Sequence, residues 1–127
     1  MPTTNASKNA LHKVLVIEDE GDMCILLNIL LESKNVKVSH VKTLLDAMLF
    51  LKEEQPSLIL LDNRLPDGYG IDFIAFLKAN YPSIRIIMIS GVDAAAEDVA
   101  LEAGADTFLA KPFTKQKLHH SINTLLN

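Results

Sequence analysis

Five short segments of the chain have the apolar pattern of strands, and segments with helical periodicity separate them. The predicted strands cover residues 14–17, 36–41, 58–62, 84–89 and 106–110. The predicted helices cover residues 22–33, 43–54, 71–80, 94–103 and 115–126. This alternation predicts an α/β fold, a doubly wound five-stranded parallel sheet flanked by five helices. With right-handed crossovers, the usual strand order at this size is 2-1-3-4-5, the flavodoxin-like order.

The third predicted strand leads to a candidate functional carboxylate. Residues 58–61 are four consecutive aliphatic side chains that run directly into Asp62, and Pro66, Gly68 and Gly70 follow. A continuous apolar run bounded by turn residues predicts a strand that is buried on both faces. Asp62 is therefore expected at the carboxyl edge of the sheet, where ligands bind in open α/β folds.

Charged and polar residues follow other strands at the same predicted edge. Glu18 and Asp19 follow the first strand, Ser90 the fourth and Lys111 the fifth. Three converging carboxylates repel one another unless a cation joins them, and Mg²⁺ prefers oxygen ligands of this kind. With a lysine and a hydroxyl nearby, the set predicts a phosphoryl site with a carboxylate nucleophile. The alternative is a solvated acidic rim with Lys111 in a surface ion pair.

The predicted first helix carries apolar residues on two sides. At about 100° per residue, one broad face is expected to pack against the sheet, and its members are Met23, Leu26, Leu27, Leu30 and Leu31. Ile25 and Ile29 lie one turn apart on the opposite side. They are either scattered surface residues, which are common, or a docking stripe, because a helix bound in a groove uses this spacing.

Composition narrows the class of protein. The chain has 127 residues, 49% hydrophobic and 22% charged, which suits one globular domain. The net charge is −4, so direct nucleic-acid binding is not expected. A single cysteine and the lack of a long apolar segment favour a reducing compartment without a membrane span, and we expect a cytoplasmic protein. Residues 1–12 are polar and are expected to form a flexible arm before a domain at residues 13–127.

The ordered motifs resemble the receiver domains of two-component response regulators, the chemotaxis-regulator-like fold. The resemblance covers residues 13–126 and is carried by residues 14–20, 60–62, 65–68, 89–91, 103–106 and 108–113. It implies that Asp62 accepts a phosphoryl group from a histidine kinase with Mg²⁺. It further implies that Asp19 ligates the metal directly, that Glu18 acts mainly through bound water, and that the carbonyl of Arg64 completes the ligands.

The same resemblance implies roles for the remaining strand-end residues. Ser90 and Lys111 are expected to contact the phosphoryl oxygens, and the Lys111–Pro112 peptide is expected to be cis. Ser90 and Phe108 are expected to form the switch, in which Phe108 stands where tyrosine is frequent. The protein is then no enzyme in the ordinary sense, although it assists its own phosphotransfer and dephosphorylation.

The resemblance also implies the kinds of partner. The phosphodonor is a sensor histidine kinase or a histidine phosphotransfer protein, and its helices are expected to pack on the first helix, beside Ile25 and Ile29. Downstream partners are an effector domain or protein and a second copy in a phosphorylation-dependent homodimer. No membrane partner is expected.

Three other classes share part of this pattern. A flavodoxin-type cofactor binder needs a phosphate-cradling loop after strand one, but residues 18–22 carry four acidic side chains there. A phosphohydrolase with an aspartyl intermediate usually has its nucleophile after strand one and a second Asp two residues on, a spacing that residues 18–20 lack. A degenerate receiver that only scaffolds partners would not need the complete acidic set.

Overall fold

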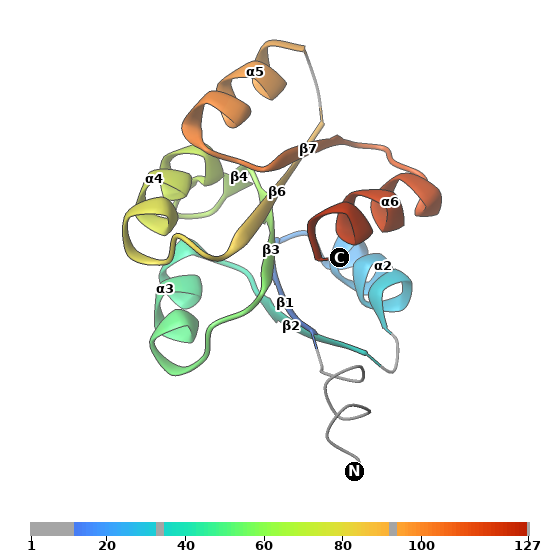
Figure 1. The fold of residues 1–127 in the computed structure, drawn as a ribbon, viewed down its shortest axis with the longest axis horizontal. Coiled ribbons are helices and arrows are strands. Elements are labelled where there is room, and N and C mark those ends of the chain that lie inside the picture. The colour runs from blue at the N-terminus through green and yellow to red at the C-terminus, as the bar shows by residue number, and fades with distance from the viewer. Residues whose placement is uncertain (1–11, 33–34, 92–93, 127) are drawn as a thin grey trace.

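A five-stranded parallel sheet forms the centre of the protein in a computed structural model that describes residues 12–32, 35–91 and 94–126 (Figure 1). The strands are β1 (His12–Ile17), β2 (Val36–Val41), β3 (Leu58–Asp62), β6 (Arg85–Ser90) and β7 (Thr107–Ala110). Their order is β2-β1-β3-β6-β7. This confirms the predicted order 2-1-3-4-5, since β4 and β5 belong to a separate two-stranded sheet.

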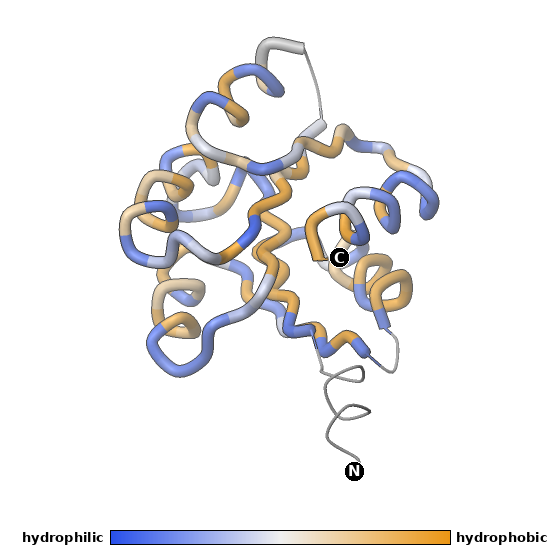
Figure 2. The backbone as a smooth tube through the Cα atoms, in the orientation of Figure 1, coloured by the Kyte–Doolittle hydropathy of each residue, from blue (hydrophilic) through white to orange (hydrophobic). Residues whose placement is uncertain are grey.

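Five helices cover the two faces of the sheet. α3 (Leu44–Glu53), α4 (Gly70–Asn80) and α5 (Ala94–Ala103) lie on one face, and α2 (Gly21–Leu31) and α6 (Lys115–Leu126) lie on the other (Figure 1). Figure 2 shows apolar residues, in orange, concentrated on the central strands. Alternate residues of each strand therefore enter two separate cores, so that Leu15 and Ile59 pack under the first helix layer and Val16 and Leu60 under the second.

Two threonine hydroxyls and one glycine lie at helix ends. The Thr43 hydroxyl accepts a hydrogen bond of 3.0 Å from the amide of Asp46, and the Thr114 hydroxyl accepts one of 3.1 Å from the amide of Lys117. Each satisfies an amide that the first turn leaves without a helical partner. Gly104 follows α5 with a φ of +119°, a conformation that favours glycine after a helix.

Helix α2 corrects one prediction. Leu26 was expected to face the sheet, yet it is 42% exposed, whereas Ile25 and Ile29 are 63% and 67% exposed, as predicted. The buried residues of the helix are Cys24, Leu27 and Leu31. The buried face of α2 is therefore narrower than expected, and it includes Cys24 in place of Leu26. The reason is that α2 packs against α6 as well as against the sheet. The predicted end at Ser33 lies outside the described residues.

A small hairpin that the sequence analysis did not predict follows Asp62. β4 (Arg64–Leu65) pairs antiparallel with β5 (Gly68–Tyr69). Asn63 closes it, because its carbonyl accepts from the Gly70 amide at 2.7 Å and its side chain accepts from the Ile71 amide at 3.1 Å. A Cβ atom at Gly70 would overlap the carbonyl oxygen of Asp62, so only glycine permits this close approach.

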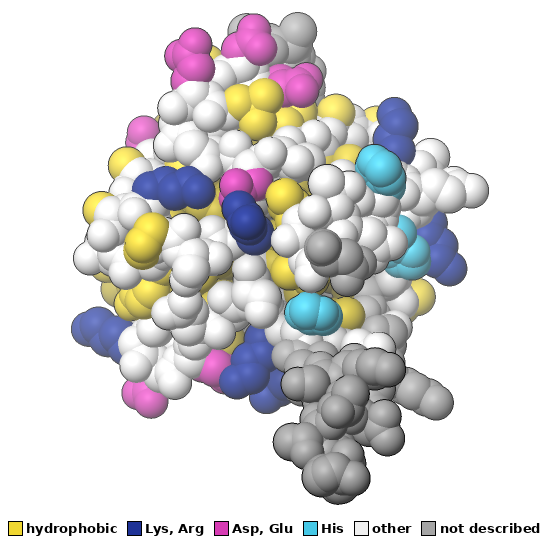
Figure 3. Space-filling view, in the orientation of Figure 1, with side chains coloured by type: hydrophobic (Ala, Val, Ile, Leu, Met, Phe, Trp, Pro, Cys, Tyr) yellow, Lys and Arg dark blue, Asp and Glu magenta, His cyan; other side chains and the backbone are white. Residues whose placement is uncertain are grey.

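The first strand begins one residue before the predicted domain boundary. β1 begins at His12, so this residue belongs to the sheet and not to the predicted arm, whose other residues, 1–11, lie outside the described part. On the face seen in Figure 3, Lys and Arg side chains (dark blue) lie at several places, and acidic ones (magenta) gather over α5. Among the described residues, no helix combines the length and the apolar character that crossing a membrane requires.

Candidate functional site

The predicted site residues come from neighbouring strand ends at one edge of the sheet. Glu18 follows β1, Asp62 ends β3, Ser90 ends β6 and Lys111 follows β7. β3 lies between β1 and β6, and β7 pairs with β6, so these four positions meet at the carboxyl edge. The parallel order of the strands thus gathers residues that are up to 93 positions apart in the sequence.

Three carboxylates form a candidate metal centre. One oxygen each from Glu18, Asp19 and Asp62 lies within 4.8 Å of the other two. Glu18 is 2% exposed and Asp62 is 8% exposed, while Asp19 lies at the surface. Hard oxygen ligands, two of them buried and one open to water, suit Mg²⁺, which keeps part of its hydration shell.

Lys111 bridges the two buried carboxylates. Its Nζ atom lies 3.1 Å from Oε1 of Glu18 and 3.3 Å from Oδ1 of Asp62. Its side chain is only 21% exposed. The alternative of a surface ion pair on a solvated rim is therefore wrong for Lys111, because both of its partners are buried.

The charges of this site are not balanced. Burial, and then the nearby charge of Glu18, raise the pKa of Asp62 from 3.8 to about 6, although Lys111 opposes the shift. Burial alone would lower the pKa of Lys111, but its hydrogen bond to Glu18 and the charge of Asp62 raise it. One ammonium thus faces two buried carboxylates and a third beside them. A divalent cation would remove the excess negative charge, so the residues fit the metal that the sequence analysis predicted.

The other predicted residues lie at the end of β6, in β4 and in β7. Ser90 is half-buried, and its carbonyl accepts a hydrogen bond of 2.9 Å from the amide of Lys111. Arg64 lies two residues after Asp62 in β4. Phe108 lies in β7, partly buried against the core beneath α3, α4 and α5. The Lys111–Pro112 peptide is cis, as expected.

Asp67 is a structural residue of the site that the sequence analysis did not identify. Its carboxylate oxygens accept hydrogen bonds of 2.9 Å from the amides of both Leu44 and Leu45, at the start of α3. These bonds lower the pKa of Asp67. The loop that begins at Asp62 is thereby fixed to a helix more than 20 residues earlier in the chain, a contact that local periodicity does not encode.

Cys24 and His40 make a second unpredicted contact behind the acidic residues. The Cys24 thiol donates to the carbonyl of Glu18 at 3.3 Å, and Nε2 of His40 lies 3.1 Å from the same oxygen and in contact with Sγ. Burial, followed by the charge of Glu18, raises the pKa of Cys24. His40 is exposed, and its ring also helps to hold the backbone of Glu18.

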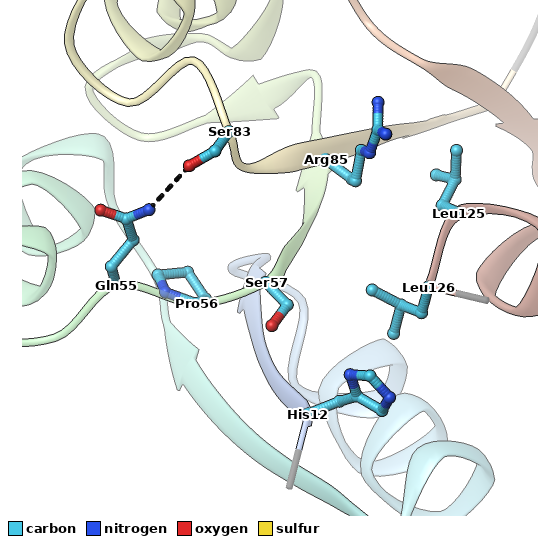
Figure 4. A pocket seen from close by; sticks show the side chains of 8 residues that line it. All are labelled: His12, Gln55, Pro56, Ser57, Ser83, Arg85, Leu125 and Leu126. Atoms are coloured by element: carbon cyan, nitrogen blue, oxygen red, sulfur yellow. Dashed lines mark hydrogen bonds between the residues drawn. The ribbon is translucent and has the colours of Figure 1, made fainter. Parts of the chain in front are cut away.

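A further hollow lies at the opposite edge of the sheet, where the strands begin. It has a volume of about 360 Å³ and is lined by residues such as His12, Ser57 and Arg85. In Figure 4, Gln55 donates a hydrogen bond to Ser83, and Arg85 projects away from Ser57. Its polar groups do not converge on one point, so this hollow does not rival the acidic site.

These observations define a class of protein: a doubly wound α/β domain with clustered carboxylates and a lysine at the strand ends. The chain belongs to the response regulator receiver domain family, whose sequence pattern it matches over residues 14–123. It is thus a receiver domain, the phosphoacceptor signalling domain of two-component response regulators, which use Mg²⁺ at an acidic pocket.

Individual relatives are similar over most of the chain. It is 38% identical to the KDP operon transcriptional regulatory protein KdpE of Escherichia coli over 101 residues, 79% of this chain and 44% of KdpE. It is 33% identical to the response regulator PilR of Pseudomonas aeruginosa over 117 residues, 90% of this chain and 26% of PilR. The chain therefore spans less than half of the length of either regulator.

Solved receiver structures have the same fold. The signal receiver domain of a LuxO repressor protein from Vibrio parahaemolyticus superposes with a TM-score of 0.85 at 28% identity, covering 91% of this chain and 90% of that one. The beryllofluoride-activated NtrC4 receiver domain, described as a dimer in solution, gives a TM-score of 0.84 at 34% identity, covering 89% of this chain and 94% of that one.

Proposed function

We propose that Asp62 is the residue of this receiver domain that accepts a phosphoryl group. The observation that carries the proposal is a buried carboxylate at the end of the central strand, with Glu18, Asp19 and Lys111 around it. Asp62 is nucleophilic only as the carboxylate, and Lys111 favours that form against burial and the charge of Glu18.

The residues around Asp62 divide the work of phosphoryl transfer. Glu18, Asp19, Asp62 and the carbonyl of Arg64 would hold Mg²⁺, which would neutralise charge on the incoming phosphoryl oxygens. Lys111 supplies a second, fixed positive charge, and Ser90 supplies a hydroxyl donor. An oxygen of Asp62 bonds to phosphorus as the nitrogen of the phosphohistidine leaves. Hydrolysis of the product by water would complete the self-dephosphorylation.

Ser90 and Phe108 form the proposed switch. Phosphorylated Asp62 offers new acceptors to the Ser90 hydroxyl, and a shift of Ser90 would make room for Phe108 to turn inward. The surface so changed consists of α5, β7 and α6. An effector domain or protein, or a second copy of the domain, would read this surface.

Mass spectrometry of the intact protein tests whether Asp62 accepts the phosphoryl group. Acetyl phosphate with Mg²⁺ should add one acid-stable, base-labile phosphoryl group of about 80 Da to the wild type. Asp62→Asn should abolish the addition, whereas Asp72→Asn, an exposed aspartate of α4, should not. Phosphorylation of Asp62→Asn at the wild-type rate, mapped to one and the same other residue in both proteins, would falsify the assignment.

The phosphodonor is a cytoplasmic histidine kinase or histidine phosphotransfer protein that docks on α2. Ile25 and Ile29 form an exposed apolar stripe there, and Leu26, at 42% exposure, extends it. α2 begins directly after Glu20, beside the acidic site. A donor that binds this stripe would thus be positioned to present its phosphohistidine to Asp62.

The docking stripe is tested with charge-matched double variants. Ile25→Glu with Ile29→Glu should slow transfer from the cognate kinase about tenfold or more and leave acetyl phosphate labelling unchanged. Leu49→Glu with Leu101→Glu, two exposed leucines of the other face, should not slow it. Equal kinase rates for both double variants would make the α2 residues ordinary surface residues.

A further inference from the structure

A groove between α3 and α4 is lined mainly by apolar side chains. Leu44, Leu45 and Met48 of α3 form one wall, and Phe73 and Phe76 of α4 form the other. Phe73 is buried, and its ring stacks on the partly exposed ring of Phe76 with the centroids 5.2 Å apart. The groove has a volume of about 410 Å³, within the range of pockets that bind ligand side chains.

Three large apolar side chains of α3 are exposed, two of them in the wall of the groove. Leu45 is 59% exposed, Leu49 is 50% exposed and Met48 is 37% exposed. These residues are three and four positions apart and therefore form one stripe along the helix. Single exposed apolar residues are common, but a continuous stripe beside a groove marks an interaction surface.

Hydrogen bonds lie at both ends of the groove. At one end, Asp67, in the hairpin that precedes α4, accepts hydrogen bonds from the amides of Leu44 and Leu45 at the start of α3. At the carboxyl ends of the two helices, the Tyr81 hydroxyl donates to the carbonyl of Leu51 at 3.4 Å. The groove is therefore preformed, and binding would require little ordering of its walls.

The charges at the groove have one sign. The carboxylates of Asp67 and Asp72 line it, and Asp46 lies in the first turn of α3. No lysine or arginine is among the groove's lining residues in the described structure. Apolar walls with acidic residues at one end complement an apolar stripe that has a basic side chain beside it.

We propose that this groove binds an amphipathic helix of a partner protein, with large apolar side chains at helical spacing and Lys or Arg next to them. Such a helix would place its apolar stripe between Met48 and Phe76 and its cation near Asp67 and Asp72. The groove lies on the face of the sheet opposite α2, and none of its lining residues belongs to α5, β7 or α6. The site is thus separate from the proposed kinase stripe and switch surface, and it does not require phosphorylation.

The probes are three synthetic peptides of 16 residues, titrated at physiological salt. The first carries Leu or Phe at positions i, i+3, i+4 and i+7, with Lys flanking them. The second has the same composition in scrambled order, so that it keeps the charge but loses the apolar stripe. The third keeps the stripe and replaces Lys with Glu. Wild-type protein should bind the first about tenfold tighter than the second and about fivefold tighter than the third.

Two variants locate the binding. Leu45→Glu with Met48→Glu should weaken the first peptide about tenfold or more, while Val99→Glu with Leu101→Glu, which has the same charge change on exposed residues of α5, should not. Amide chemical shifts should change along α3 and α4. Acetyl phosphate labelling and circular dichroism of both variants should remain normal, which separates lost binding from lost fold.

Four results would overturn the proposal. Equal affinity for the first two peptides would show that only net charge attracts them. Amide chemical-shift changes confined to helices other than α3 and α4 would place the binding elsewhere. Unchanged affinity in Leu45→Glu with Met48→Glu, in a folded protein, would exclude the groove. A wild-type dimer that this same variant dissociates would assign the groove to a second copy of the chain.

Discussion

Asp62 is the residue at which burial and charge conflict most directly. It ends an entirely buried strand, and the carboxylate of Glu18 lies beside it. Burial favours the neutral acid, and Glu18 adds to that preference, so the pKa of Asp62 rises to about 6 despite Lys111. A nucleophile must be ionised, so the site stabilises the reactive carboxylate only in part when no metal is bound.

This conflict predicts a pH-dependent gain of stability in Asp62→Asn. Without metal, the folded wild type keeps its proton up to about pH 6, whereas the unfolded chain loses it near 3.8. The contribution of Asp62 to the free energy of unfolding therefore falls as the pH rises from about 4 to about 6. The asparagine of Asp62→Asn carries no charge at any pH, so the variant does not lose this stability. Its free energy of unfolding should equal that of the wild type near pH 4 and exceed it by about 1–2 kcal/mol above pH 7.

Urea unfolding in EDTA measures this difference. Asp22→Asn is the control, because Asp22 is exposed in the first turn of α2 and lies outside the carboxylate cluster. Its effect should not follow the same pH curve. A constant difference between wild type and Asp62→Asn from pH 4 to pH 8 would show that Asp62 is not destabilised by ionisation.

At the scale of elements, the β4–β5 hairpin links the site to its surroundings. Gly70 packs on the backbone of Asp62, and Asp67 bonds to the start of α3. Neither contact follows from the sequence pattern, since Pro66, Gly68 and Gly70 indicate only that the chain turns. The sequence predicted where the loop lies, but not which parts of it touch distant helices.

Gly70→Ala should destabilise the protein more than an ordinary glycine replacement. The new Cβ would overlap the carbonyl oxygen of Asp62, which is backbone and cannot rotate away. We expect a loss of about 2 kcal/mol or more in thermal unfolding, together with slower acetyl phosphate labelling. Gly21→Ala is the matched control. A Cβ there meets nothing within 4 Å, so this variant should be neutral or more stable by up to about 1 kcal/mol.

Asp67→Ala should shorten or loosen the first turn of α3. It removes the acceptor of two amides, and the loss of such a cap costs about 1 kcal/mol. The pKa of Asp67 is lowered on folding, so its stabilisation is present above the ordinary value of 3.8 and disappears as the pH falls below it. The free energies of unfolding of the wild type and of Asp67→Ala should therefore become equal at acidic pH. Asp72→Ala, in the first turn of α4, should show a smaller effect at neutral pH.

Helix α2 shows why side-chain faces were harder to predict than elements. Periodicity correctly predicted a helix with Ile25 and Ile29 outside, but it placed Leu26 inside. Leucine is the more apolar residue, yet Cys24 is buried because its thiol contacts the carbonyl of Glu18 and the ring of His40. The orientation of the helix depends on the packing of α6 and on these contacts, which only the assembled fold specifies.

At the scale of the whole molecule, most of the fold and of the site composition could be predicted. Strands buried on both faces, separated by helices, permit few topologies, and parallel order sends every strand-end residue to one edge. Glu18, Asp62 and Lys111 could therefore be placed together in advance. Their distances, their burial and the resulting charge imbalance could not, because these depend on packing.

Metal binding should couple the site to the stability of the whole domain. Mg²⁺ would relieve the repulsion among Glu18, Asp19 and Asp62, which the folded state assembles and the unfolded chain does not. At a concentration of 100 times the dissociation constant, such a ligand adds about 2.7 kcal/mol. For a domain of this size, each kcal/mol raises the melting temperature by about 3–5 °C, so differential scanning calorimetry should detect a rise of roughly 10 °C over the EDTA sample.

Asp19→Asn should remove most of this rise, because it deletes one of the three carboxylates and leaves the buried pair in place. The melting temperature in EDTA should be unchanged or higher, since one repulsive charge is gone. Asp22→Asn, three residues further on and outside the cluster, should keep the full response to Mg²⁺. An Mg²⁺-dependent rise as large in Asp19→Asn as in the wild type would place the metal at other ligands. A loss of the rise in both variants would point instead to the general acidity of this end of the molecule.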